Sequence, residues 1–120
     1  MHQLVFQFYF QFYQIILIRL GQIILDPGIG FGKNLKHNLT LISKISLFHS
    51  LGLPILIGTS RKRFISQISG INDSRERIGG TVASVLFLLS QGVQIFRVHN
   101  VNEVKQGILV FSKILSYLKN

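Results

Sequence analysis

A short apolar run that ends in an acid and a glycine-rich loop constrains this chain more than any other stretch. Residues 23–25 favour β-structure and show no polar alternation, which indicates a strand buried on both faces, as in a parallel sheet. Pro27 stops the ladder directly after Asp26, because it has no N–H to donate. In the following loop, residues 28–33, glycine takes every second position and lets a flat ligand approach the main chain. The stretch predicts a strand that delivers a carboxylate to a binding site.

Two phosphate-binding loops have similar glycine patterns, and spacing excludes both. A P-loop requires Gly-Lys-Ser/Thr and another glycine five residues earlier, but Asn34 follows Lys33 and Pro27 stands five residues before Gly32. A dinucleotide-binding loop requires a glycine three residues after Gly30, where this chain has Lys33. The loop is therefore expected to serve another kind of ligand.

The length of 120 residues allows one domain at most. A complete (β/α)8 barrel takes about 250 residues. The chain is 48% apolar and 14% charged, against roughly 25% charged residues in an ordinary soluble domain. This composition argues against disorder and predicts that surface belonging to a partner covers part of the chain.

The net charge of +9 favours anionic partners. The basic residues are scattered through the chain and form no stripe with interleaved aromatics, so the pattern favours a small phosphorylated ligand over nucleic acid. The chain has no cysteine, which excludes disulfides and thiolate metal sites and fits a reducing cytosol. We therefore expect a cytoplasmic protein without a nucleic-acid partner.

Residues 1–20 are rich in aliphatic and aromatic side chains and contain no acid. They lack the early basic region and the small-residue cleavage site of a signal peptide. They also do not form a continuous membrane span, because four glutamines interrupt them: Gln3, Gln7, Gln11 and Gln14. The glutamine spacing places all four on one stripe of a helix. We expect a helix over residues 1–20, ahead of a domain at 21–120, although the aromatics fit a strand nearly as well.

The rest of the chain repeats a strand followed by a helix three times. Strands are expected at residues 23–25, 55–57 and 93–99, and the first helix is expected to end near Gly52. The second and third helices have acid-containing cap pairs at their starts, Asp73 with Glu76 and Asn100 with Glu103. Repeated strand–helix units predict an α/β fold with parallel strands joined by right-handed crossovers.

The unusual chemistry of the chain follows directly after the three strands. Residues 26–33 follow the first strand, residues 60–62 the second, and Arg97 and His99 close the third. The carboxyl ends of parallel strands meet at one edge, where α/β proteins bind ligands. We expect these groups to lie close together.

Each of these groups also has a simpler interpretation. Asp26 is either a turn acid or an acceptor for two hydrogen bonds from an amino-pyrimidine edge. Arg97 is better explained by an anionic ligand than by an internal ion pair, since the chain has only four acids. His99 is either a capped core histidine or a ligand group that shares a strand face with Arg97.

Other candidates are set aside. Arg61 and Arg63 are interpreted as solvated or structural, and Ser60 has no histidine and acid at the spacing of a nucleophile. The remaining histidines lack metal-ligand spacing, so we expect no metal site within this chain: His2, His37 and His49.

Three ordered motifs, residues 26–33, 58–62 and 97–99, resemble the C-terminal half of dihydropteroate synthase, the pterin-binding (β/α)8-barrel enzyme of folate synthesis. The resemblance covers about residues 21–120. It implies a partial TIM barrel in which the three strands are the sixth, seventh and eighth of the barrel, here preceded by the apolar helix.

The resemblance also implies roles for single residues. Asp26 would bind the pterin ring, Lys62 would contact the pterin with its stem beside the aminobenzoate, and Arg97 and His99 would flank the pterin and bind the diphosphate. The implied catalytic residues are Lys62, Arg97 and His99. The implied substrate-binding residues are Asp26, Gly30, Phe31, Ser60, Lys62, Arg97 and His99.

The activity implied is the joining of a 7,8-dihydropterin diphosphate to 4-aminobenzoate with release of diphosphate. The implied Mg²⁺ would be bound by the first five strands, which have no counterpart in this sequence, and Asn100 stands where the family usually has aspartate. Two alternatives remain: a non-catalytic pterin-binding remnant, and a methyltetrahydrofolate-dependent methyltransferase-like domain. The expected partner is a chain with the N-terminal half of the barrel or a second copy.

Overall fold

The structure is a computed structural model that describes residues 5–9, 14–18, 23–30 and 32–118. The strands of these described ranges are β1 (Val5–Tyr9), β2 (Gln14–Ile18), β3 (Ile23–Asp26), β4 (Leu56–Ile57) and β5 (Ile95–Phe96). The α-helices are α1 (Leu35–Ser43), α2 (Arg63–Ser69), α3 (Ile78–Ser90) and α4 (Val101–Tyr117). Two 3-10 helices complete the set, η1 (Ile45–Leu51) and η2 (Ser74–Glu76).

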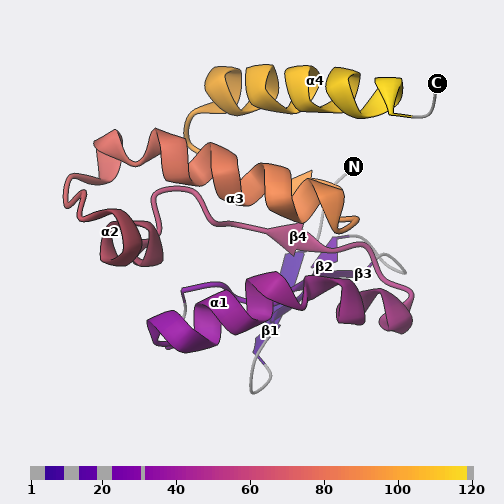
Figure 1. The fold of residues 1–120 in the computed structure, drawn as a ribbon. Helices are drawn as coiled ribbons and strands as arrows, with labels where there is room; N and C mark the ends of the chain where they lie inside the picture. Colours follow the sequence, from indigo (N-terminus) through magenta and orange to yellow (C-terminus); the bar gives the residue numbers. More distant parts are fainter. Residues whose placement is uncertain (1–4, 10–13, 19–22, 31, 119–120) are drawn as a thin grey trace.

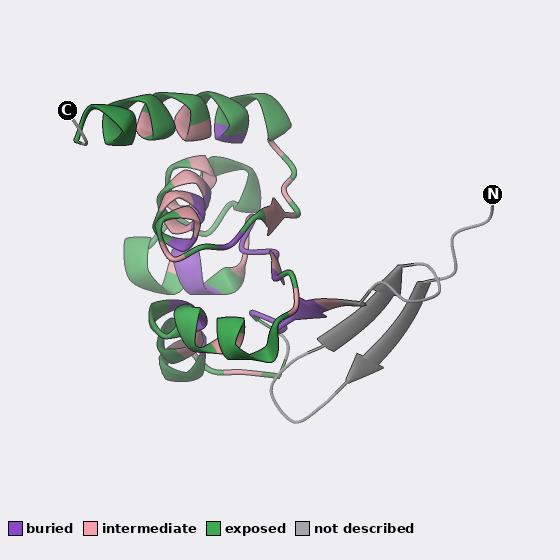
Figure 2. Cartoon of the chain, turned by 90° about the vertical axis from the view of Figure 1, so that its right-hand side faces the viewer, coloured by how far each residue is buried: buried purple, intermediate pink, exposed green. Residues whose placement is uncertain are grey.

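The strands of the three predicted strand–helix units lie side by side and run parallel. Leu25 of β3 pairs with Ile55, and its N–H donates to the carbonyl of Pro54 at 2.9 Å. β4 and β5 pair in parallel, with Ile57 opposite Phe96. β4 runs between α3 and α1 (Figure 1), and the helices form a layer along one side of the parallel strands (Figure 2). The predicted α/β class is confirmed, but β5 is shorter than the strand expected at residues 93–99.

The helix predicted over residues 1–20 is wrong wherever the structure describes that segment. β1 pairs antiparallel with β2, and β2 pairs antiparallel with β3, with Ile16 opposite Ile24. β3 offers unpaired backbone N–H and C=O groups along the edge that faces away from β4. Pairing these groups stabilises strands more than the helical spacing of the glutamines stabilises a helix. The remaining residues of this prediction, 1–4, 10–13 and 19–20, lie outside the described residues.

The apolar core lies between the parallel strands and the first three helices. β-branched and aliphatic side chains from the strands meet one face of each helix, because strand residues buried on both faces need covering. The buried members are Ile29, Ile42, Ile45, Ile55, Ile57, Phe64, Ile65, Leu88 and Val93. This core holds the carboxyl ends of β3, β4 and β5 in fixed relative positions.

The helix ends agree only in part with the predicted caps. Gly52 ends η1 in the left-handed region with φ 69°, as predicted. Asp73 accepts from the N–H of Arg75 and caps the short η2, whereas α3 begins five residues later with no side-chain cap. Asn100 precedes α4 but its side chain forms no cap hydrogen bond. Both predicted cap pairs are therefore wrong for the helices to which they were assigned.

The last helix, α4, packs against α3 along one face only. A methyl group added to Gly107 would lie 2.9 Å from Cγ1 of Val82, so the two helices approach closely there. Val104 is the one buried residue of α4. Ile114 and Tyr117 are 61% and 66% exposed, which leaves apolar surface uncovered on this helix. In the described ranges, no helix is both long and apolar enough to cross a membrane.

Two adjacent glycines of α3 provide a test of this packing. A methyl group at Gly80 would overlap Cγ2 of Ile65, whereas one at Gly79 would meet open space. We expect Gly80→Ala to lower the free energy of unfolding by about 1–3 kcal/mol, because overpacking outweighs the gain in helix propensity. Gly79→Ala should raise it by up to about 1 kcal/mol. Denaturant unfolding of both variants measures this, and a stabilised Gly80→Ala variant would contradict the packing of α2 on α3.

Candidate functional site

The carboxylate of Asp26 lies buried at the end of β3, with 1% of the residue exposed. Its Oδ1 accepts a hydrogen bond from the N–H of Gly28 at 2.8 Å. Its Oδ2 has no hydrogen-bond partner among the described residues, and the nearest cation there is Nη2 of Arg97 at 3.6 Å. A buried carboxylate oxygen without a donor is costly. Asp26 is thus both the turn acid and an open acceptor at the edge where a ligand would bind.

Arg97 reaches Asp26 across β4, and Gly58 makes that path open. The N–H of Arg97 donates to the carbonyl of Ile57 at 3.0 Å, which continues the β4–β5 pairing by one residue. A methyl group added to Gly58 would lie 3.1 Å from Nη2 of Arg97. The Arg97 side chain is 52% exposed, so one side of the guanidinium meets the acid while the other faces solvent. It can therefore contact an anion without leaving the site.

Asn38 of α1, which is not among the predicted site residues, holds the glycine loop. Its buried side-chain Oδ1 accepts from the N–H of Gly30 at 2.8 Å. Gly30 has φ 87°, a conformation that suits glycine. Lys33 closes the loop by donating from Nζ to the carbonyl of Gly28 at 2.9 Å. A buried asparagine among the apolar residues of a predicted helix was the signal that could have revealed this contact.

Lys62 extends from the turn after β4 over the glycine loop. A methyl group at Gly30 would lie 3.0 Å from Cδ of Lys62, so the lysine stem passes directly over this glycine. Burial lowers the pKa of Lys62, and the positive charges of Arg97 and Lys33 lower it further, while Asp26 opposes the shift. Burial also lowers the pKa of Lys33, again opposed by Asp26. An added anion would relieve this crowding of cations.

Ser60 and His99 form a contact that the sequence did not predict. The Ser60 side chain is buried, and its Oγ lies 2.8 Å from Nδ1 of His99. The N–H of His99 donates to the same Oγ at 3.0 Å. β5 ends at Phe96, so strand alternation does not place His99. The serine hydroxyl orients the imidazole instead, which gives Ser60 a positioning contact in place of the nucleophile geometry already set aside.

The small polar residues of α3 support the turn after β4. Thr81 accepts from the N–H of Arg61 at 3.1 Å, and Ser84 donates to Oγ1 of Thr59 at 2.8 Å. These hydrogen bonds fix residues 59–61. Phe31, another predicted site residue, lies outside the described residues.

The described residues offer no metal centre. No three acid, histidine or cysteine side chains gather among them. Asp26 interacts with Lys33, Lys62 and Arg97, so its surroundings suit an anionic or hydrogen-bonding ligand better than a divalent cation. The site can accept hydrogen bonds at one buried oxygen and hold negative charge beside it.

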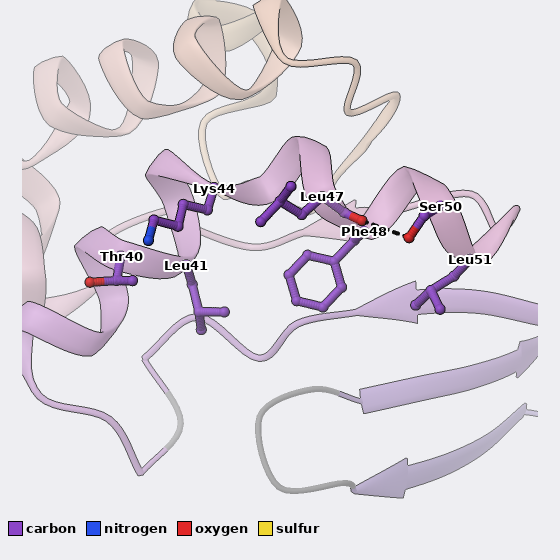
Figure 3. Close-up of a pocket in the computed structure, with 7 residues that line it drawn as sticks. All are labelled: Thr40, Leu41, Lys44, Leu47, Phe48, Ser50 and Leu51. Atoms are coloured by element: carbon purple, nitrogen blue, oxygen red, sulfur yellow. Dashed lines mark hydrogen bonds between the residues drawn. The ribbon is translucent and has the colours of Figure 1, made fainter.

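A separate apolar hollow of about 400 Å³ lies on α1 and η1. Figure 3 shows its lining side chains, among which Leu47 is 69% exposed and Ser50 donates to the carbonyl of Leu47 at 2.9 Å. None of the lining residues belongs to the loops after β3, β4 or β5. The hollow lacks the convergent polar groups of a ligand site. The candidate site is therefore the edge that carries Asp26, Lys62 and Arg97.

Known proteins match this fold and these loops. The family described as "Pterin binding enzyme" matches residues 11–99. The dihydropteroate synthase of Escherichia coli K12 is 41% identical over 99 residues, which cover 82% of this chain and 35% of that protein. The dihydropteroate synthase of Bacillus subtilis 168 is 45% identical over 94 residues, covering 78% of this chain and 33% of the relative.

Solved structures agree with the sequence matches. The crystal structure of dihydropteroate synthase from Thermus thermophilus superposes with a TM-score of 0.77 and 42% identity, covering 79% of this chain and 38% of that one. The same bacterium's enzyme has also been solved in complex with 6HMPPP and with 4-aminobenzoate. This chain spans about a third of the length of these relatives. The resemblance expected from the three motifs is confirmed, and the chain belongs to the pterin binding enzyme family.

Proposed function

We propose that this chain supplies the C-terminal part of the active site of a dihydropteroate synthase, a transferase of folate biosynthesis. The observation that carries the proposal is the buried Asp26 carboxylate, whose Oδ2 has no hydrogen-bond donor among the described residues and lies near three cationic side chains. An amino-pyrimidine ring would donate to that oxygen, and the neighbouring cations would receive a diphosphate. The dihydropteroate synthases that the chain resembles over 78–82% of its length support this assignment.

In the proposed reaction, the amine nitrogen of 4-aminobenzoate attacks the methylene carbon that carries the diphosphate on the 7,8-dihydropterin. A C–N bond forms, the C–O bond to diphosphate breaks, and the amine releases one proton. Asp26 would bind the pterin edge, and its negative charge would stabilise positive charge that develops on the ring. Arg97 and His99 would hold the diphosphate as it leaves, and Lys62 would contact the pterin with its stem beside the aminobenzoate. These three would be the catalytic residues.

The other substrate contacts are proposed from the family resemblance together with the positions of the described residues. Gly30 lets the Lys62 stem lie directly against the loop backbone, so a flat ring would bind beside the lysine stem. Ser60 would orient His99 and, with Phe31, hold the aminobenzoate. Any Mg²⁺ used by the complete enzyme would bind outside this cationic site. A cytoplasmic location stays a prediction.

We further propose that the three strand–helix units are part of a (β/α)8 barrel. β3, β4 and β5 would be three consecutive barrel strands, and the preceding barrel strand would take the edge of β3 that β2 occupies here. The remaining units would cover the exposed apolar face of α4. The exposed Ile114 and Tyr117 support such a covering. The remaining units would come from a polypeptide that carries the N-terminal part of the barrel.

The proposed function can be tested by reconstitution. The chain is mixed with a separately expressed N-terminal segment of the E. coli relative, and dihydropteroate formation from the two substrates is measured. We expect turnover from the mixture, and sedimentation should show one heterologous complex. If the mixture binds pterin diphosphate without turnover, the chain is a non-catalytic pterin-binding remnant. If the chain sediments as a compact monomer of 13.6 kDa and does not bind the segment, that result would contradict the barrel proposal.

Arg97→Ala tests the diphosphate contact. If Arg97 binds the diphosphate, this variant should weaken binding of the pterin diphosphate by roughly 10- to 100-fold, because a charge-assisted hydrogen bond is lost. Binding of the bare pterin should change much less. Isothermal titration with both ligands measures the difference, and Arg63→Ala removes an exposed arginine from the neighbouring helix as a control. If the variant weakens binding of both ligands equally, Arg97 contacts the pterin ring or stabilises the fold and does not bind the diphosphate.

A further inference from the structure

Arg61 adopts a backbone conformation that is unusual for a residue with a side chain. Its φ is 58°, and it is the one non-glycine residue with positive φ in the part of the chain that the structure describes. Left-handed backbone is unfavourable for an arginine, so surrounding contacts must hold it there. Arg61 stands between Ser60 and Lys62, two residues of the proposed site. Its conformation therefore sets the direction in which the chain delivers Lys62.

The backbone N–H and carbonyl of Arg61 both form hydrogen bonds with residues in or directly before α3. Its N–H donates to Oγ1 of Thr81 at 3.1 Å, and Thr81 is fully buried in α3. Its carbonyl accepts from Nη1 of Arg77 at 2.9 Å, and Arg77 also donates to the carbonyl of Asn72. The turn is thus tied to the start of α3 on both sides of one residue.

The side chain of Arg61 crosses to the loop that follows β5. Its Nη2 donates to Oδ1 of Asn100 at 3.4 Å, which is long for a hydrogen bond. Its Nε is buried and has no hydrogen-bond partner within the described ranges. The amide of Asn100 has one acceptor oxygen, so it cannot serve both nitrogens in the parallel arrangement that a carboxylate allows. The contact is present but leaves one buried donor unsatisfied.

This contact lies next to a second link between the same two loops. Ser60 contacts His99, and Arg61 contacts Asn100, so two consecutive residues of one loop pair with two consecutive residues of the other. We propose that Arg61 is a positioning residue that fixes the loop of Lys62 against the loop of His99 and so sets the geometry of the proposed pterin diphosphate site. The proposal rests on the proposed function for the identity of the ligand, but not for the link itself.

Hydrogen exchange tests the link without any ligand. Arg61→Met keeps the stem and removes the guanidinium, and Arg63→Met makes the same change at an exposed arginine two residues on. The amide of His99, which donates to Ser60, should exchange about tenfold faster in Arg61→Met than in Arg63→Met. Equal exchange of the His99 amide in the two variants would overturn the proposal.

Asn100 provides the reciprocal test. Asn100→Asp offers a second oxygen to the unsatisfied Nε, so it should slow exchange of the His99 amide several-fold, and only while Arg61 is present. The same slowing in the Arg61→Met background would show that the aspartate acts elsewhere and would overturn the proposal. If Arg61→Met does not fold, Asn100→Ala removes the contact from the other side and should accelerate exchange in the same way.

Ligand binding then separates this proposal from the proposed function. In the reconstituted complex, Arg61→Met should lower the affinity for pterin diphosphate about tenfold relative to Arg63→Met. Asn100→Asp should bind this ligand at least as tightly as the parent. Unchanged affinity in Arg61→Met would overturn the positioning role. If the parent complex does not bind pterin diphosphate at all, the proposed function fails, and the exchange measurements alone decide whether Arg61 links the two loops.

Discussion

The buried carboxylate of Asp26 is the constraint on which the rest of the site depends. One oxygen accepts a hydrogen bond from the turn that follows β3, while the other is buried without a hydrogen-bond donor in the described part of the chain and lies 3.6 Å from Nη2 of Arg97. A buried carboxylate oxygen without a hydrogen bond lowers the stability of the folded chain, and a ligand that donates a hydrogen bond removes this cost. Cationic side chains converge near this one oxygen because two glycines leave room for them. Gly58 lets the Arg97 guanidinium pass, and Gly30 lets the Lys62 stem lie over the glycine loop. The fold thus holds a polar acceptor ready for a flat, hydrogen-bonding ring.

Much of this arrangement could be predicted from sequence, because local signals and topology agree there. The apolar runs before Asp26 and before Gly58 marked buried parallel strands, and parallel strands place their carboxyl ends at one edge. Asp26, Lys62 and Arg97 were therefore expected together, and they are together. The family was identifiable because the residues of three motifs, 26–33, 58–62 and 97–99, match it in order and separation.

The failures have a common physical origin in contacts between distant segments. Residues 5–9 and 14–18 form strands because the free edge of β3 provides backbone partners, which glutamine spacing cannot reveal. Asn100 contacts Arg61 rather than capping α4, and Asn38 holds a loop eight residues earlier in the chain. Periodicity shows which face of an element is apolar. It does not show which single polar side chain on that element will find a partner in a loop.

The central claim is that the open Oδ2 of Asp26 accepts a hydrogen bond from the amino-pyrimidine edge of a pterin. A double-mutant cycle tests it directly: the parent and Asp26→Asn are each titrated with a pterin and with its analogue lacking the ring amino group. The account predicts that each change alone weakens binding by about 1.5–3 kcal/mol and that the second adds little once the first is made. Fully additive losses would mean that Asp26 and the amino group do not meet, and would contradict the account.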